Sequence, residues 1–273
     1  MVVAHVTGGL VEALNARVYG HGNQTLVLAH GFGSDQMAWH YILPYLAYYF
    51  KVLVFDMAFS WKVRPDFYNK EKYSTFNGYA DDLIGLLDEL NMTRSIYLGH
   101  SMSAMVGCIA ATQRPHLFKH LILLGGSPRY LNDEGYEGGF EMSDLEQIFH
   151  DIEYNFSSWV SIFAPNAIGV NDPTAIQEFK SSLGKMKPDV ALDVAKTVFL
   201  SDLRGVLGHE HIHCTIIQAK KDFVVPTSVS YYMGKRLGKD TRTVILETQG
   251  HLPMLTAHSL LLDVLKKVLC IHG

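Results

Sequence analysis

Short runs of apolar residues recur along the chain, and the longer segments between them carry apolar residues about every three to four positions. A continuous apolar run is typical of a strand buried on both faces, and the wider spacing is typical of a helix with one buried face. Strands that alternate with helices predict a parallel sheet covered by helices on both sides. The runs that predict strands are 26–29, 52–55, 95–98, 120–124, 215–218 and 243–246, and segment 10–19 is expected to hold the first edge strands.

The segments between these runs predict the covering helices. In segment 78–90, for example, Ala80, Leu83 and Leu87 fall on one helical face. The other helices are expected at 37–48 with an interruption at Pro44, at 102–110, at 226–237 and at 257–269.

The alternation stops between residues 132 and 202, where the pattern predicts four helices and no strand. Long insertions in a compact domain are typical of lids over a site. We therefore predict a single α/β domain with a mostly parallel sheet. Its core comprises residues 1–131 and 203–273, and a four-helix lid of residues 132–202 is inserted after the sixth strand.

Local signals mark each lid helix. Ser143 and Glu146 have the spacing of a capping box. Asp172 followed by Pro173 is a typical helix start, because aspartate caps the first turn and proline fits its first position. The other two helices are expected at 157–163, stopping before Pro165, and from Pro188 onward.

The amino-acid composition limits the kinds of binding partner and the cellular compartment that we expect for this protein. Of the 273 residues, 48% are hydrophobic and 18% are charged, and the formal net charge is −4 with a pI of about 6.4. This balance supports a large core and argues against nucleic acid or an anionic membrane surface as partner. We find no signal-peptide pattern and no run of about 18 apolar residues, so we expect a soluble intracellular protein. The cysteines lack a pairing pattern, which predicts reduced thiols: Cys108, Cys214 and Cys270.

A serine lies where a predicted strand meets a predicted helix, in Gly99-His100-Ser101-Met102-Ser103. Such a turn raises the serine hydroxyl above the edge of the sheet, and it needs small neighbours because strand and helix approach closely. Gly99 and Ser103 are small, although glycine is more usual at the second position. Taken alone, the pattern also fits an ordinary polar loop.

Two further loops follow predicted strands and hold Asp222 and His251. The order serine, aspartate, histidine is that of the catalytic triad in α/β hydrolases, whose sites lie at the carboxyl ends of strands. A neutral imidazole, with an ordinary pKa of about 6.5, can take the proton of Ser101 as its oxygen attacks. We therefore predict Ser101 as nucleophile, His251 as base and Asp222 as the residue that orients it. Asp56, at the end of another strand, is the weaker alternative for the acid.

Hydrogen-bond donors must stabilise the charge that develops on the substrate oxygen. We predict the backbone N–H groups of Met102, at the helix start, and of Phe32, in the loop His30-Gly31-Phe32-Gly33. A plain glycine turn is the alternative for this loop.

Two other groups of residues are weaker candidates. The segment from His209 to Cys214 looks like a metal cluster, but His211 and His213 share a face only with each other, so we expect a solvated edge and no metal or other cofactor. For the aromatic residues in and near the lid, the two alternatives are the hydrophobic core and the lining of a pocket. They are Tyr130, Phe140, Trp159, Phe163, Phe179 and Phe199.

Several segments resemble the strigolactone and karrikin receptors of plants, which are α/β hydrolases with a four-helix lid. The segments are Gly-His-Ser-Met-Ser-Ala-Met at 99–105, His-Gly-Phe-Gly-Ser-Asp-Gln at 30–36, Ser-Pro-Arg-Tyr-Leu-Asn-Asp at 127–133 with Gly-Gly-Phe-Glu at 138–141, and Gly-His-Leu-Pro at 250–253. The resemblance covers nearly the whole chain.

The resemblance implies a butenolide-type ligand that Ser101 attacks, cleavage of an enol-ether bond, a ring fragment left on His251, and slow turnover. It also implies a lid that rearranges to bind an F-box protein of a ubiquitin ligase and repressor proteins, in a cytoplasmic and nuclear monomer. The alternatives are a carboxylesterase for small esters without a signalling role, and a binding protein with little turnover. The pocket positions of the family correspond to Phe32, Tyr130, Phe140, Phe163, Phe179 and Phe199.

The chain departs from the family in the turn that follows strand 52–55. Where the family carries glycines, this chain has Phe59 and Trp61, whose side chains restrict a tight turn. By resemblance, the chain belongs to a third, divergent branch of the family.

Overall fold

The computed structural model describes residues 9–208 and 212–271. Counted over these residues, seven strands form a sheet in the order β1-β3-β2-β4-β5-β6-β7. β1 pairs with β3 in antiparallel fashion, and the other neighbours pair in parallel, as predicted. The strands are β1 (Arg17–Tyr19), β2 (Thr25–Ala29), β3 (Lys51–Phe55), β4 (Ser95–His100), β5 (Phe118–Leu124), β6 (His213–Lys221) and β7 (Arg242–Gln249).

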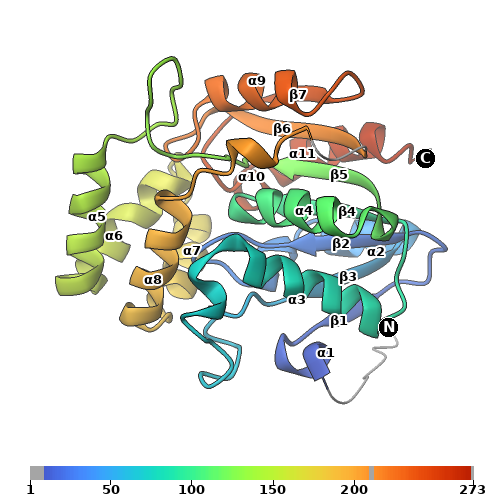
Figure 1. Cartoon of the computed structure of the whole chain (residues 1–273), viewed down its shortest axis with the longest axis horizontal. Helices are drawn as coiled ribbons and strands as arrows, with labels where there is room; N and C mark the ends of the chain where they lie inside the picture. Colours follow the sequence, from blue (N-terminus) through green and yellow to red (C-terminus); the bar gives the residue numbers. More distant parts are fainter. Residues whose placement is uncertain (1–8, 209–211, 272–273) are drawn as a thin grey trace.

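Helices cover both faces of the sheet, which explains why its central strands are continuous apolar runs. Every residue of β2 and β4 is buried. In Figure 1, α3 and α4 lie in front of the sheet and α2 lies behind it. The helices of the core are α1 (Gly9–Ala13), α2 (Leu43–Tyr49), α3 (Phe76–Glu89), α4 (Met102–Gln113), α9 (Thr227–Arg236), α10 (Pro253–Thr256) and α11 (His258–Val268).

Within the described residues, four α-helices stand between β5 and β6, at the left of Figure 1, where the sequence predicts the lid. Their inward side chains belong to the same buried cluster as the strands, so the lid is packed onto the core. The division into a core of 1–131 and 203–273 and a lid of 132–202 stays a prediction. The lid helices are α5 (Met142–Tyr154), α6 (Phe156–Ile168), α7 (Pro173–Gly184) and α8 (Pro188–Phe199).

The start of the described chain differs from the prediction. Residues 9–13 form the helix α1 rather than an edge strand, so the lid follows β5, the fifth strand within the described ranges, and not a sixth. The Glu89 carboxylate accepts a hydrogen bond from the Leu10 N–H (2.8 Å) and so satisfies an amide that the first helical turn leaves open. The fully buried Leu14 anchors the segment in the core.

Two prolines act differently from the prediction. α6 does not stop before Pro165 but continues to Ile168. The proline removes one helical hydrogen bond, and the buried side chains of Phe163 and Ile168, on either side of the proline, hold the helix in the core. The helix expected over 37–48 is instead divided into a 3-10 turn, η1 (Gln36–Trp39), and α2, with Pro44 in the first turn of α2.

The cap of α5 also differs from the prediction. Glu141 and Asp144 form the capping box by reciprocal hydrogen bonds to the backbone, and Ser143 lies inside the helix. A carboxylate at the cap accepts from the first-turn amides as a serine hydroxyl does, so the same capping chemistry operates two residues earlier. The predicted start of α7 is confirmed, since Asp172 accepts from the Ala175 N–H at 3.0 Å.

Candidate active site

Ser101 lies in the tight turn between β4 and α4. Its backbone dihedrals are φ 56° and ψ −123°, a conformation that costs a non-glycine residue about 1–3 kcal/mol and survives only where the surroundings enforce it. The Ser101 N–H donates to the Leu124 carbonyl (2.8 Å), which fixes the turn against β5. The turn projects the hydroxyl beyond the carboxyl edge of the sheet, as the sequence predicts.

The residues two positions before and after Ser101 are small for different structural reasons. A Cβ on Gly99 would lie 2.5 Å from the Ser103 carbonyl oxygen, so only glycine fits there. Ser103 occupies the position where glycine is more usual, and its hydroxyl donates to the carbonyl of His30. This serine therefore ties the elbow to the loop that follows β2.

The three predicted catalytic residues come together at the carboxyl ends of β4, β6 and β7. His251 Nε2 lies 2.8 Å from Ser101 Oγ, and His251 Nδ1 lies 2.8 Å from Asp222 Oδ2. Ser101 and His251 are each 6% exposed. The arrangement is an unbroken hydrogen-bonded chain from a hydroxyl through an imidazole to a carboxylate, which is the geometry of general-base activation of a nucleophile.

Asp222 is fixed by groups that the sequence did not predict. Its Oδ1 accepts hydrogen bonds from the backbone N–H groups of Val224 (2.7 Å) and Val225 (3.2 Å). Its Oδ2 accepts a further bond from the side-chain amide of Gln218 (3.1 Å), which is fully buried in β6. The carboxylate therefore has one orientation, with Oδ2 facing His251.

The backbone of His251 is held on two sides. Its N–H donates to the Ala167 carbonyl at the end of lid helix α6 (2.7 Å). Its carbonyl accepts from Nε2 of His100 (2.8 Å), another residue that the sequence did not predict. Burial keeps the pKa of His100 well below its ordinary value, so this ring is neutral and acts as a fixed hydrogen-bond donor.

The loop after β2 is fixed in the same way by His30. Its Nδ1–H donates to the Gly31 carbonyl (2.9 Å), and its Nε2 accepts from the Met57 N–H (2.9 Å). Burial lowers the pKa of His30, which favours this neutral tautomer. Asp56, the alternative acid, accepts a hydrogen bond from the Gln36 N–H (2.9 Å) and takes no part in the hydrogen bonds that join Ser101, His251 and Asp222. That alternative is therefore wrong.

The predicted oxyanion donors lie on either side of Ser101. Met102 is the first residue of α4, so its N–H has no acceptor within the helix. The loop after β2 passes close to the nucleophile, since a Cβ on Gly31 would lie 2.9 Å from Ser101 Cβ, and Phe32 follows directly. The N–H groups of Phe32 and Met102 stay the predicted donors to the substrate oxygen.

Most of the predicted pocket residues lie along one series of ring contacts under the lid. Tyr130 is fully buried, and burial raises the pKa of its hydroxyl. Tyr130 and Phe140 pack on Phe199, with ring centres 5.2 and 5.5 Å apart. Phe140 also packs on Phe223, and Phe223 packs on Phe163, with ring centres 6.0 and 6.3 Å apart.

The series of ring contacts continues from Phe163 towards the loop after β2. Phe163 stacks on Trp159 (5.0 Å), and Phe32 packs on Trp159 (6.4 Å) and on Phe59 (6.2 Å). Phe179 contacts the loop after β2 from the side of α7, since a Cβ on Gly33 would lie 3.3 Å from it. Phe59 is buried and fills the turn in which the chain departs from its family.

Metal binding and membrane insertion can be judged only for the described part of the chain. Within it, no three histidine, cysteine or acidic side chains are placed to hold a metal ion. His209, Glu210 and His211 of the suspected cluster lie outside the described residues, and His213 begins β6. None of the described helices is both long and apolar enough to cross a membrane.

Comparison with known proteins places this geometry among hydrolases. A family model described as the alpha/beta hydrolase family matches residues 26–264. The chain is similar to a strigolactone esterase of Arabidopsis thaliana, with 47% identity over 95% of this chain and 97% of that protein. It is also similar to a karrikin insensitive 2 receptor of Petunia hybrida, with 45% identity over 94% and 96%. Among solved structures, a hydrolase from Oleispira antarctica has a TM-score of 0.92 and 30% identity, covering 96% of this chain and 97% of that one.

Proposed function

Since the chain belongs to the alpha/beta hydrolase family, and within it to the family of strigolactone esterases and karrikin receptors, we propose that it binds a butenolide-type lactone and hydrolyses it slowly with Ser101 as nucleophile. The observation that carries this proposal is the chain of 2.8 Å hydrogen bonds from Ser101 through His251 to Asp222. Acyl transfer requires such a chain, whereas a protein that only binds its ligand does not.

The geometry supports a reaction in two stages. His251 Nε2 takes the proton of Ser101 Oγ while this oxygen bonds to the carbonyl carbon of the lactone, and the N–H groups of Phe32 and Met102 stabilise the oxyanion. The bond to the leaving oxygen then breaks as His251 returns the proton, which leaves an ester on Ser101. The freed ring oxygen becomes a hydroxyl on the carbon that carries the enol ether, and this hemiacetal collapses to an aldehyde with release of the enol. The acyl fragment then passes from Ser101 Oγ to a ring nitrogen of His251, which restores the serine hydroxyl, and water finally hydrolyses the acyl imidazole.

Slow turnover follows from the position of the site under the lid. Ser101 and His251 are almost buried, and the lid helices share one apolar cluster with the core. Ligand entry and product release therefore require the lid to move, and such a motion rather than the chemistry limits the rate.

Replacing Ser101 by alanine tests the proposal. We expect the variant S101A to hydrolyse a synthetic butenolide enol ether no faster than the uncatalysed background, because the attacking oxygen is gone. The ligand should still raise the melting temperature, because binding remains. Intact-mass and peptide mapping of the unmodified chain should locate a ring fragment on His251. The exposed Ser158 offers a matched control, S158A, with unchanged hydrolysis.

Hydrolysis by S101A at a rate near that of the unmodified chain would overturn the role of Ser101. Fast turnover of p-nitrophenyl acetate without any adduct on His251 would instead favour a general carboxylesterase, the second candidate, since the same hydrogen-bonded chain serves any small ester.

We also propose that partner proteins detect the bound state through the lid. Large apolar side chains are exposed on the lid, among them Tyr154 (67%) and Ile162 (66%). Tyr154 ends α5 and Ile162 lies in α6, and exposed apolar side chains of this size are candidates for contact with a protein partner. By family resemblance this partner is an F-box protein, with repressor proteins as its targets, in the cytoplasm and nucleus. Failure of the F-box protein to co-precipitate at any butenolide concentration would contradict this role.

A further inference from the structure

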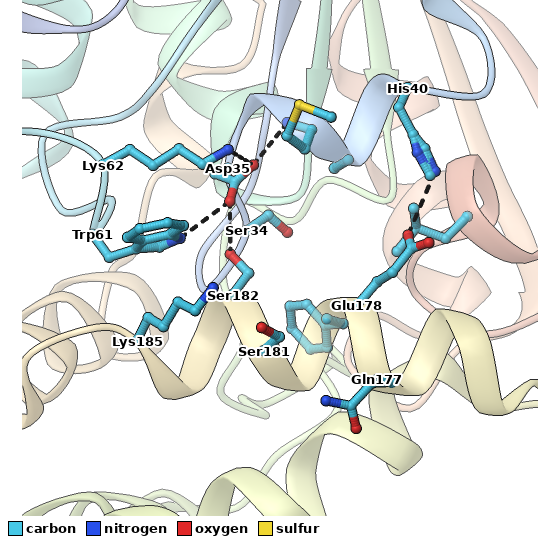
Figure 2. A pocket seen from close by; sticks show the side chains of 14 residues that line it. Ser34, Asp35, His40, Trp61, Lys62, Gln177, Glu178, Ser181, Ser182 and Lys185 are labelled. Carbon is cyan, nitrogen blue, oxygen red and sulfur yellow. Dashed lines mark hydrogen bonds and ion pairs between the residues drawn. The ribbon is translucent and has the colours of Figure 1, made fainter.

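A cleft of about 470 Å³ lies between lid helix α7 and the 3-10 turn η1 (Figure 2). Its lining comes from residues 34–40, from the turn at Trp61 and Lys62, from residues 177–185 and from Leu255. The three residues of the proposed triad are all described and do not line it. The cleft shares Phe179 with the predicted ligand pocket but contains no residue of the triad, and it has the size that small ligands occupy in proteins.

One end of the cleft is aromatic and positively charged. Lys62 Nζ forms an ion pair with Asp35 Oδ1 (3.0 Å), and the Trp61 indole N–H donates to the other oxygen of Asp35 (3.2 Å). Lys185 Nζ lies 4.3 Å from the centre of the Trp61 ring, and within the described residues no carboxylate lies at ion-pair distance from it. The charge of Lys62 is therefore balanced, and that of Lys185 is not.

The opposite end of the cleft holds His40 and Glu178, whose Nε2 and Oε2 atoms lie 3.5 Å apart (Figure 2). Between the two ends the wall includes Phe179 and Leu255. Ser34 also lines the cleft, is only 5% exposed, and has a hydroxyl without a hydrogen-bond partner in the described structure. Buried hydroxyls normally have a partner, so an unpartnered one in a cavity wall points to a polar ligand atom.

We propose that this cleft is a second binding site, for a small organic acid with a flat apolar body. The carboxylate of the ligand pairs with the ammonium group of Lys185, whose charge nothing else in the described structure balances. The flat body packs between the Trp61 ring and the apolar wall of Phe179 and Leu255. Ser34 supplies a hydroxyl to the same ligand.

The cleft also adjoins the loop that carries the predicted oxyanion donor. A Cβ on Gly33 would lie 2.7 Å from Leu183 Cδ1 of α7, so this loop and the helix are in direct contact. Asp35 lies two residues after Gly33 in the same loop, and its Oδ2 accepts a hydrogen bond from the Ser182 hydroxyl of α7 (3.3 Å). A ligand in the cleft therefore touches both the lid and the loop, without entering the space above Ser101.

Calorimetric titration of the full chain with 2-naphthoate tests the proposal. We expect one molecule to bind per chain, and the neutral isostere 2-naphthamide to bind about tenfold more weakly, because it cannot pair with the ammonium group. The variant K185Q should weaken naphthoate about tenfold and leave naphthamide nearly unchanged. The matched control is K187Q, since Lys187 is a neighbouring lysine that does not line the cleft.

Because the titration measures binding alone, it does not depend on whether the chain hydrolyses a butenolide. An excess of the butenolide enol ether should leave naphthoate binding unchanged. Absence of naphthoate binding at about 1 mM would overturn the proposal. Equal affinity of K185Q and the unmodified chain, or displacement of naphthoate by the butenolide, would overturn it too.

Discussion

Oδ2 of Asp222 accepts hydrogen bonds from two side chains, His251 (2.8 Å) and Gln218 (3.1 Å). The same amide nitrogen of Gln218 also donates to the Val225 carbonyl (3.0 Å), in the loop that carries Asp222. A fully buried glutamine thus fixes both the carboxylate and its loop. At the scale of single residues, Gln218 is a positioning residue that acts on the reaction through Asp222.

Replacing Gln218 by leucine should lower kcat about tenfold and leave KM nearly unchanged, because the carboxylate loses its fixed orientation while the ligand contacts remain. Steady-state hydrolysis of the butenolide measures both parameters. Thr215 lies on the same strand and bonds to His120, so T215V controls for disturbance of β6. Equal kcat in Q218L and the unmodified chain would refute the positioning role.

The sequence predicted the three residues that meet at the strand ends, but it did not predict the residues whose hydrogen bonds fix them there. Ser101, Asp222 and His251 each follow a recognisable strand, so the chain itself marks their place. His100 lies 151 positions from its partner His251, and no local pattern links them. Ser103 lies 73 positions from His30, so the sequence does not explain the serine at this position, whereas the hydrogen bond between the two residues does.

At the scale of elements, lid helix α6 and the loop after β7 approach closely. A Cβ on Gly250 would lie 1.9 Å from the Ile168 carbonyl oxygen, and its φ of 96° is itself unfavourable for any other residue. The next residue, His251, donates its N–H to the Ala167 carbonyl. The base is therefore attached to the lid as well as to the core.

The variant G250A should separate these two elements. We expect a loss of about 1–3 kcal/mol in the free energy of unfolding and a lower kcat, because the end of α6 must move and His251 loses its backbone acceptor. Urea unfolding and steady-state kinetics measure the two effects. A Cβ on Gly205 meets nothing within 4 Å, so G205A should change neither quantity, and equal behaviour of the two variants would refute the argument.

Helices and strands were predictable as elements because their apolar periodicity is local, whereas their ends were not. α6 continues through Pro165 because buried residues on both sides of the proline keep it in the core. α1 depends on Glu89, which belongs to another helix. In both cases a tertiary contact overrides the local signal.

At the scale of the whole molecule, the predicted fold and the resemblance to the strigolactone and karrikin receptors are confirmed. The chain is 47% identical to the strigolactone esterase and 45% identical to the karrikin insensitive 2 receptor, so the identities do not favour one kind of relative over the other. Membership of a third branch stays a prediction. The folded chain also buries three histidines whose pKa burial lowers, which are His30, His100 and His120. For His120 the pKa falls to about 4.

These histidines make stability depend on pH. The unfolded chain takes up protons below about pH 6.5, while the folded chain keeps these rings neutral, so acid favours unfolding. We expect the free energy of unfolding to fall between pH 6.5 and 4.5, and His120, whose pKa in the folded chain is about 4, to contribute up to about 1.4 kcal/mol per pH unit to this fall. Urea unfolding at several pH values measures this slope.

The variant H120Q should make the free energy of unfolding depend less steeply on pH, because glutamine does not titrate and the contribution of His120 is lost. T215V removes only the hydrogen bond to His120 and should keep the slope. An identical slope in H120Q and the unmodified chain would show that His120 does not contribute.

The bond between His251 and Ala167 has a consequence for the order of events after a ligand arrives. Ser101 needs the imidazole of His251 in place, and undocking α6 would remove one of the two backbone hydrogen bonds that hold His251. On the proposed function, a lid that rearranges to bind a partner would therefore disturb the catalytic geometry for that interval. Hydrolysis and partner binding would then compete for each ligand molecule.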